Sequence, residues 1–478
     1  MTALRGNSAV GLLLAIGFIL GLLVIALVVS DVSATDFLRV CLIALLLIPA
    51  FASIWLHRRI DFFFPPVLFS FIVFLGHVLP VPRFIRGEDV LNQTWPYSFR
   101  DLPESLDRAL LMTVLGVSGF YLGFLVPLRR HEYRQPSEVV LNRTRLLFIG
   151  TLYTIVGLGL FTIGVVLIGG PGALIAGLHD RVRLFAGLNY FLLAPILLPT
   201  FALVWWVYLL QRRRPRDWHF WTYTSFALLL SGLMGSRANT FLVILAGVIL
   251  YHCLYKRISL PVVMALVSAG AIGLVAFHLY FREYLVLGEL VSVGARPSLG
   301  ELWDVLTKSL GGDFFQIQAL TILVDAIPDL ISFQNGATYM FLLVAPIPSS
   351  IWPAKAQFLT SPTAFTLALW PKKWLVEGIT IPPSLMGEMY LNFGTAGVFA
   401  GMIAFGALYK LMHVRAESRR PSAVLINSIV LATMVHYIRA DFPAATVLVV
   451  MIGLPSYLAL RWTGKRRVRP PGIQLQGT

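Results

Sequence analysis

Long runs of apolar residues, separated by short polar clusters, repeat along almost the whole chain. Runs of about 18 residues or more are long enough for a helix to cross about 30 Å of hydrocarbon. One helix for each run predicts about twelve transmembrane spans. The predicted spans cover residues 9–30, 37–55, 63–80, 107–128, 146–169, 187–210, 217–234, 238–255, 259–281, 384–409, 422–437 and 443–461.

Composition supports a membrane protein. Of 478 residues, 57% are apolar and 13% are charged, against roughly 45–50% and about 25% in soluble domains. A soluble fold would have to bury a dozen helices that have almost no polar face. The first run lacks a small-residue cleavage site, so residues 9–30 are expected to be a span and not a signal peptide. The predicted fold class is an all-α polytopic membrane protein.

Basic clusters mark every second loop between the predicted spans. Such alternation predicts that both termini lie in the cytoplasm, because Lys and Arg concentrate on that side. These clusters carry most of the net charge of +15, and on the cytoplasmic side they face anionic lipid headgroups. Nucleic-acid binding is not expected, since the basic residues are dispersed and not gathered in one domain. The clusters are His57-Arg58-Arg59, Arg129-Arg130, Arg212-Arg213-Arg214, Lys256-Arg257, Arg419-Arg420 and Lys465-Arg466-Arg467.

The opposite, outer side carries one long segment, residues 282–383. It is rich in Trp, Phe, Leu and Pro, with helical periodicity over 299–310 and 314–326. We expect a cap of short amphipathic helices on the outer face, with Trp352 and Pro353 where the chain turns back to the membrane. The predicted organisation is residues 1–281 with nine spans, the cap 282–383, and residues 384–478 with three spans and a cytoplasmic tail.

Arginines at the outer ends of spans are the strongest functional signal. Arg237 and Arg439 each occupy a turn of a few residues on the side where arginine is unusual. Ser236 is a candidate N-cap, and free helix amides beside an arginine form an anion site. The alternative for Arg237 is that it reaches lipid phosphate at the interface. In a chain of many spans, the anion to be held there is expected to be the diphosphate of a lipid-linked sugar. Further candidate diphosphate-binding arginines are Arg282, Arg181 and Arg183.

Three residues are candidates for a general base. Glu388 ranks first because it falls at the outer start of the tenth span, where an acid is costly unless it is paired or functional. His436 ranks second; it is three residues from Arg439 and so shares its helix face. Asp313 ranks third. The alternatives are a salt bridge that locks a span end for Glu388 and a solvated loop position for Asp313, while Asp441 could simply neutralise Arg439.

Four residues are candidates for substrate contacts: Tyr390, Asn392, Trp352 and Asn239. The aromatic members could equally belong to an interfacial belt. No metal or other cofactor is expected, because the outer loops have no Asp-x-Asp and the chain has no phosphate loop or metal-binding His pair. Arginines would then have to stabilise a departing phosphate.

Together these motifs resemble the bacterial oligosaccharide repeat-unit polymerases, the O-antigen and enterobacterial common antigen polymerases. The residues that carry the resemblance are Gly235 to Asn239, Ile347-Pro348, Trp352-Pro353, Pro383 to Gly397, and Arg439. Their order and spacing match over roughly residues 140–460, whereas the first four predicted spans are generic.

The resemblance implies a membrane-embedded glycosyltransferase of the type that uses polyprenyl-linked donors, in the bacterial inner membrane. A growing glycan would move from undecaprenyl diphosphate onto a new lipid-linked repeat unit at the periplasmic face, as in lipopolysaccharide synthesis. Donor, acceptor and membrane lipids are the expected partners. A chain-length regulator and a repeat-unit flippase are further candidates.

Two other functions remain open from the sequence. An O-antigen ligase or a polyprenyl-phosphate-sugar transferase would keep the donor and change the acceptor. The ligases use a histidine in the outer segment, and residues 282–383 contain none. A transporter of lipid-linked sugars would be expected to show internal repeats and mid-membrane charges, and neither is evident.

Overall fold

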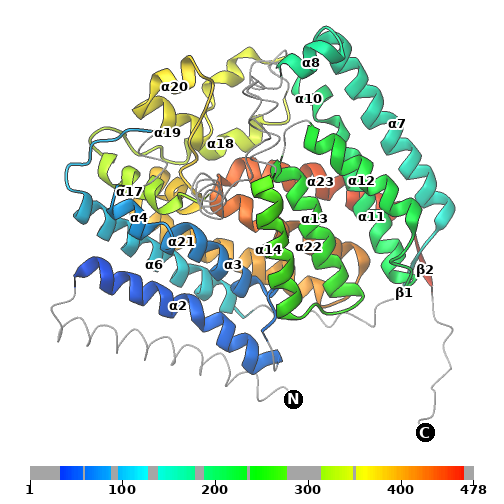
Figure 1. Cartoon of the computed structure of the whole chain (residues 1–478), viewed down its shortest axis with the longest axis horizontal. Coiled ribbons are helices and arrows are strands. Elements are labelled where there is room, and N and C mark those ends of the chain that lie inside the picture. The colour runs from blue at the N-terminus through cyan, green and yellow to red at the C-terminus, as the bar shows by residue number, and fades with distance from the viewer. Residues whose placement is uncertain are drawn as a thin grey trace, which may run out of the picture.

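The computed structural model describes residues 33–57, 60–87, 95–127, 138–177, 188–233, 237–276, 314–347 and 351–467. Within these ranges the chain is helical apart from one short β-ribbon (Figure 1). The first helices are α2 (Ala34–His57), α3 (Pro65–Val73), the π-helix η1 (Phe74–Val78), α4 (Val81–Ile85) and α6 (Leu102–Leu125). After strand β1 (Glu138–Leu141) come α7 (Arg143–Leu167), α8 (Pro171–Gly177), α10 (Asn189–Leu192), the 3-10 helix η3 (Ala194–Ile196), α11 (Leu197–Gln211), α12 (Trp218–Leu233), α13 (Arg237–Leu254) and α14 (Leu260–Ala276). The remainder comprises α17 (Gln316–Ala326), α18 (Ala337–Val344), the 3-10 helix η5 (Pro353–Gln357), α19 (Ser361–Leu369), α20 (Pro371–Leu375), α21 (Leu385–Ala416), α22 (Pro421–Arg439), α23 (Phe442–Thr463) and strand β2 (Gly464–Arg467).

Helices coincide with every predicted span that falls on described residues, which confirms the all-α polytopic class. Among the described residues, eight stretches are long and apolar enough to cross a membrane. Shorter helices, α12, α13 and α14, occupy three more predicted spans. The predicted span 9–30 lies outside the described residues. The eight stretches are Ala34–Ile54, Pro65–Ile85, Leu102–Leu125, Arg143–Leu167, Tyr190–Gln211, Leu385–Ala416, Pro421–Arg439 and Phe442–Thr463.

Helices α6 and α21 approach each other closely. A Cβ added to Gly123 of α6 would lie 2.0 Å from the Ile403 carbonyl oxygen, and one added to Gly406 of α21 would lie 2.0 Å from the Phe120 carbonyl oxygen. Only glycine permits this approach of two backbones, as in small-residue packing of membrane helices. The α6–α21 pair thereby fixes the position of α21, which carries the candidate base.

A two-stranded antiparallel ribbon joins the start of α7 to the end of α23. Glu138 pairs with Arg467 and Leu141 with Gly464, and the Asn142 N–H donates to the Thr463 carbonyl at 3.0 Å. The basic cluster at 465–467, expected in the cytoplasmic tail, therefore belongs to a strand. Both strands belong to segments that the charge pattern places on one side of the membrane, so this pairing agrees with the span count.

The outer segment is folded where the structure describes it, from residue 314. It has its own hydrophobic cluster, built from α17, α19, the start of α21 and the stretch around Trp95. Helix α17 confirms the predicted helix over 314–326, but it is not amphipathic. Nearly every residue of α17 is buried because α6 and α21 pack against it. The other predicted helix, 299–310, lies outside the described residues.

Polar contacts attach the stretch 95–105 to this segment. The Trp370 indole N–H donates to the Pro96 carbonyl at 2.9 Å. Asp325 accepts hydrogen bonds from the Tyr97 hydroxyl at 2.7 Å and the Ser105 hydroxyl at 2.8 Å. Two regions that the sequence assigns to the same membrane face therefore pack together.

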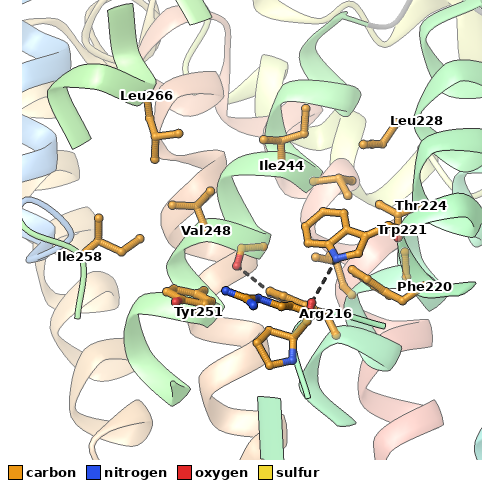
Figure 2. A pocket seen from close by; sticks show the side chains of 16 residues that line it. Arg216, Phe220, Trp221, Thr224, Leu228, Ile244, Val248, Tyr251, Ile258 and Leu266 are labelled. Atoms are coloured by element: carbon orange, nitrogen blue, oxygen red, sulfur yellow. Dashed lines mark hydrogen bonds between the residues drawn. The ribbon is translucent and has the colours of Figure 1, made fainter. Parts of the chain in front are cut away.

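Helices α11 to α14 line a cavity of about 450 Å³ (Figure 2). Trp206 of α11 and Trp221 of α12 form part of its wall. The Trp206 indole N–H donates to the Gly247 carbonyl at 3.0 Å, and the Trp221 indole N–H donates to the Pro215 carbonyl at 3.0 Å. Both indole donors are satisfied by backbone, so the wall they present is apolar.

Helix α21 is interrupted at Gly394, which has φ 64° and ψ −156°. That conformation is essentially restricted to glycine. The break frees two carbonyl groups of the preceding turn, and the loop before α18 satisfies them: Gln334 N–H donates to Leu391 O at 2.9 Å, and Asn335 N–H donates to Asn392 O at 3.1 Å. The interruption is thus the attachment point of the outer segment.

Gly394→Ala is expected to lower the free energy of unfolding by about 1–3 kcal/mol, because alanine cannot adopt this conformation without strain. Thermal unfolding of the purified protein in detergent measures the effect. The matched control is Gly159→Ala, since Gly159 is helical and an added Cβ there meets nothing within 4 Å. Equal melting temperatures for both variants would show that the interruption at Gly394 is not required.

Candidate active site

Glu388 is completely buried, with an exposed fraction of 0%, on the first turn of α21. Its Oε1 accepts a hydrogen bond from the Thr338 hydroxyl of α18 at 3.0 Å, and its Oε2 accepts one from the Phe442 N–H at 2.6 Å. Phe442 is the first residue of α23. The carboxyl group therefore joins three helices and supplies an acceptor to a free amide at a helix start, where negative charge is favoured.

Asn392 lies one turn further along α21 and is also fully buried. Its side-chain N–H groups donate to the Thr338 hydroxyl and the Glu388 carbonyl, both at 2.8 Å. Its Oδ1 accepts from the Gly336 N–H at 2.9 Å. Glu388, Thr338 and Asn392 thus form one network, which we call the carboxylate network. In this arrangement the Asn392 amide is occupied by protein groups.

Asp441 lies beside the carboxylate network, because it immediately precedes Phe442. It is only 2% exposed, and its Oδ2 has no hydrogen-bond partner among the residues that the structure describes. Burial raises the pKa of Asp441 from 3.8 to about 6. Ionisation of Asp441 therefore lowers the stability of the fold, a cost that is absent below about pH 4 and complete above about pH 6.

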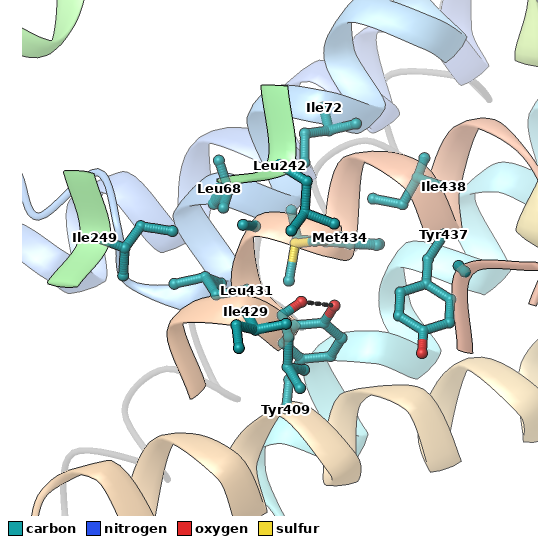
Figure 3. Close-up of a cluster of buried hydrophobic side chains, with 14 of the residues drawn as sticks. Leu68, Ile72, Leu242, Ile249, Tyr409, Ile429, Leu431, Met434, Tyr437 and Ile438 are labelled. Atoms are coloured by element: carbon teal, nitrogen blue, oxygen red, sulfur yellow. Dashed lines mark hydrogen bonds between the residues drawn. The ribbon is translucent and has the colours of Figure 1, made fainter. Parts of the chain in front are cut away.

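His436 and Arg439 lie on the last turn of α22, adjacent to Asp441, and both are half-buried. Helix α22 packs against α13. Figure 3 shows Leu242 of α13 beside Met434 and Ile438 of α22, with Ile249 toward Leu431, so the two helices run antiparallel. Consequently α13 begins at the end of the bundle where α22 finishes.

Arg237 is the first residue of α13. The antiparallel packing therefore brings the Arg237 and Arg439 backbones to the same end of two neighbouring helices, although they are far apart in sequence. Asn239 falls in the same first turn of α13. The side chains of Arg237 and Asn239 lie outside the described part, as do Arg181, Arg183, Arg282 and Asp313 altogether, so their predicted roles stay predictions.

The two aromatic candidates have different surroundings. Tyr390 of α21 is half-buried, and its ring lies 6.2 Å from that of Phe333. Trp352 precedes η5, and its ring is 5.5 Å from that of Phe358. Lys355 of η5 donates to the Ala345 and Ile347 carbonyls, both at 2.8 Å. These two hydrogen bonds hold η5 against the end of α18. The chain therefore turns back close to Trp352, where a turn was predicted.

An apolar groove of about 620 Å³ runs along α21. Tyr339 and Phe442 lie at one end of it, with ring centroids 6.0 Å apart. Phe442 also donates its N–H to Glu388, so the groove begins beside the carboxylate network. Its floor consists of small residues that recur along one face of α21. The remaining lining residues are Met389, Phe393, Ala396, Gly397, Ala400, Gly401, Ala404, Phe405 and Leu408.

Two parts of the site, Thr338 and the α21 groove, were not predicted from the sequence. Thr338 carries no distinguishing signal, because a threonine in a loop-rich segment is common. The groove could have been inferred from the spacing of Ala396, Ala400 and Ala404, which places three small residues on one helix face. The i, i+4 spacing of Glu388 and Asn392 was also a signal that they share a partner.

Comparison with known protein families shows which family the chain belongs to. The family model described as "O-antigen polysaccharide polymerase Wzy" matches residues 12–466. The chain belongs to the O-antigen polysaccharide polymerase Wzy family. No curated protein and no solved structure matches this chain.

As a member of the Wzy family, the protein is a glycosyltransferase-type enzyme that polymerises lipid-linked repeat units in lipopolysaccharide synthesis. It is a multi-pass protein of the inner membrane. The match covers both the outer segment and the helices that hold Glu388 and Arg439. The site described above therefore falls within the matched residues.

Proposed function

We propose that this Wzy protein transfers a growing glycan from undecaprenyl diphosphate onto an incoming lipid-linked repeat unit at the end of the bundle where α13, α21, α22 and α23 meet. An acceptor hydroxyl oxygen attacks the anomeric carbon of the donor, and a new C–O bond forms. The bond from that carbon to the diphosphate oxygen breaks, and undecaprenyl diphosphate leaves with the bonding electron pair.

One observation carries the proposal: Glu388 is a buried carboxyl group whose donors, the Thr338 hydroxyl and the Phe442 N–H, are both neutral. Among the described residues it forms no salt bridge, which disfavours the alternative that Glu388 locks a span end through a salt bridge. A carboxylate held by neutral donors keeps the ability to accept a proton. Glu388 would take the proton of the acceptor hydroxyl as that oxygen attacks, and Asp441 and His436 are the neighbouring titratable groups.

Arg439 and Arg237 would hold the diphosphate. Negative charge increases on the leaving diphosphate as the glycosidic bond breaks, and fixed cations stabilise that charge without a metal ion. Arg439 ends α22 and Arg237 begins α13, two helices that pack side by side. The start of α13 adds backbone amides that favour an anion. Arg181, Arg183 and Arg282 are proposed as further contacts from the same membrane face.

The groove along α21 would hold the polyprenyl chain. Its lining is apolar, its volume of about 620 Å³ lies within the usual range of ligand sites, roughly 300–1,000 Å³, and it begins beside the carboxylate network. Tyr390, Trp352 and Asn239 are proposed sugar contacts. Asn392 would act as a positioning residue, since its amide orients Thr338 and through it Glu388.

The charge pattern supports an orientation in which both termini are cytoplasmic and the site faces the periplasm. Residues 282–383 would then form a periplasmic cap over the site, in a membrane-embedded fold of the type found in polyprenyl-dependent transferases. In that orientation the site meets repeat units after a flippase has moved them, and a chain-length regulator would bind on the same face.

Ala400→Leu is expected to weaken polymerisation by raising the Km for lipid-linked repeat unit about tenfold or more. The larger side chain would fill the groove. Each lipid methylene that it keeps out of the groove weakens lipid binding by roughly 0.8 kcal/mol. The readout is the Km for lipid-linked repeat unit in a purified system. The control is Ala269→Leu, an exposed position on α14 outside the groove. An unchanged Km for Ala400→Leu would remove the groove from the substrate path.

The direct test of the reaction combines purified protein with synthetic lipid-linked repeat units and separates the products by size. A ladder of glycans that lengthens by whole repeat units, with release of undecaprenyl diphosphate, is expected. Transfer of repeat units across a vesicle membrane without any elongation would instead establish a transporter.

A further inference from the structure

The cavity between α11, α12, α13 and α14 is remote in sequence from the carboxylate network and opens among exposed apolar side chains. Trp221, Ile244 and Leu266 line it and remain about half exposed, at 50%, 48% and 47%. Gly247 also lines it, and an added Cβ at this position meets nothing within 4 Å. The cavity therefore contains open space that the side chains of the bundle do not fill.

Among the described residues, one charged side chain lines this mainly apolar cavity. Arg216 is exposed in the turn between α11 and α12, and Figure 2 shows its side chain pointing toward the Tyr251 ring. The nearest acid in sequence, Asp217, is engaged at the start of α12, where its Oδ1 accepts from the Phe220 N–H at 3.2 Å.

Other cations surround the same end of the cavity. Arg212 and Arg213 of the same turn lie over aromatic rings, at 5.6 Å from Tyr208 and 6.0 Å from Tyr255. The turn that follows α13 contributes Lys256 and Arg257. The positive-inside pattern assigns both turns to the cytoplasmic face, where anionic headgroups lie at the same depth.

We propose that this cavity binds one anionic phospholipid of the cytoplasmic leaflet, with an acyl chain between α12, α13 and α14 and its phosphate at Arg216. The apolar wall favours an acyl chain, and the basic end favours an anionic group. A ligand that carries both is an anionic lipid. The cavity volume of about 450 Å³ fits part of a chain within the usual range of ligand sites. A free phosphate would leave the apolar space empty.

Any crevice between membrane helices can hold lipid chains without selecting a headgroup. A built site differs in two measurable ways. It prefers an anionic over a zwitterionic lipid through Arg216, and it loses the lipid when the open space at Gly247 is filled. Both differences are measured as lipid binding, so they can be tested without measuring polymerase activity.

The experiment is native mass spectrometry of the purified protein titrated separately with dioleoyl phosphatidylglycerol and dioleoyl phosphatidylethanolamine. The unmodified protein is expected to retain phosphatidylglycerol preferentially. Arg216→Gln is expected to weaken that binding about fivefold, the effect of one cation near an anionic lipid. Gly247→Leu is expected to weaken it about tenfold or more, because each excluded methylene costs roughly a factor of four.

Gly159→Leu is the matched control, since Gly159 also faces open space on a helix but lies outside this cavity. It should bind phosphatidylglycerol like the unmodified protein. Equal binding of both lipids by the unmodified protein, or equal retention by Gly247→Leu and Gly159→Leu, would overturn the proposal. Stronger competition by undecaprenyl phosphate than by phosphatidylglycerol would also overturn it and assign the cavity to a substrate lipid.

Discussion

Arg439→Ala is expected to reduce polymer synthesis about 100–1,000-fold, the usual effect of removing a charged donor from a transition state. The reason is that the leaving diphosphate gains negative charge as the glycosidic bond breaks, and a charge-assisted contact contributes roughly 1.5–3 kcal/mol. Arg237→Ala should have a similar effect. Lysine at either position should restore activity only partly, because it lacks the planar pair of donors. The measurement is kcat for elongation of lipid-linked repeat units.

Arg415→Ala is the control for these variants. Arg415 lies at the opposite end of the bundle, near the end of α21, and its side chain is exposed. This variant should polymerise normally. If Arg439→Ala and Arg415→Ala elongated glycans at the same rate, Arg439 would be an interfacial residue with no part in the diphosphate site.

Glu388→Gln is expected to lower kcat about 100–10,000-fold, the contribution that a general base usually makes. Glutamine has nearly the same size, and its carbonyl oxygen can still accept from the Phe442 N–H or the Thr338 hydroxyl. The helix junction should therefore survive while the basicity is lost. The paired readouts are kcat and the thermal midpoint, which should fall only slightly.

Thr338→Val provides the comparison for Glu388→Gln. Valine removes the hydroxyl that donates to Glu388 and accepts from Asn392, so it disturbs the network and leaves the carboxylate in place. It should lower the thermal midpoint more than Glu388→Gln and kcat less. Normal polymer amount and length from Glu388→Gln would exclude Glu388 as the base and direct attention to His436 or Asp441.

Hydrophobic periodicity was sufficient to predict the helices, because a bilayer requires backbone hydrogen bonds to be satisfied within each span. The predicted span 443–461 and helix α23 (Phe442–Thr463) differ by only a residue or two at each end. The same periodicity could not predict that α17 is buried on nearly all sides. Its burial depends on the packing of α6 and α21, which are distant in sequence.

The site was only partly predictable for a related reason. Arg439 stood out because arginine is unusual at the outer end of a span, and Glu388 because an acid at the start of a span is costly unless it is paired or functional. The partners of Glu388 did not, since the Thr338 hydroxyl reaches it through the docking of α18 and the Phe442 N–H through the position of the start of α23. A glycine in an apolar span does not by itself reveal a break of this kind. Asp441 was recognised as a possible partner of Arg439, but its burial beside Glu388 follows from tertiary packing.

Glycan transfer is proposed to take place where α13, α21, α22 and α23 meet. A structure of the Glu388→Gln variant bound to a lipid-linked repeat unit would locate the substrate itself. We expect a diphosphate within hydrogen-bond distance of Arg439 and Arg237, with the polyprenyl chain along the α21 groove. A diphosphate bound elsewhere, such as in the cavity between α11 and α14, would contradict it.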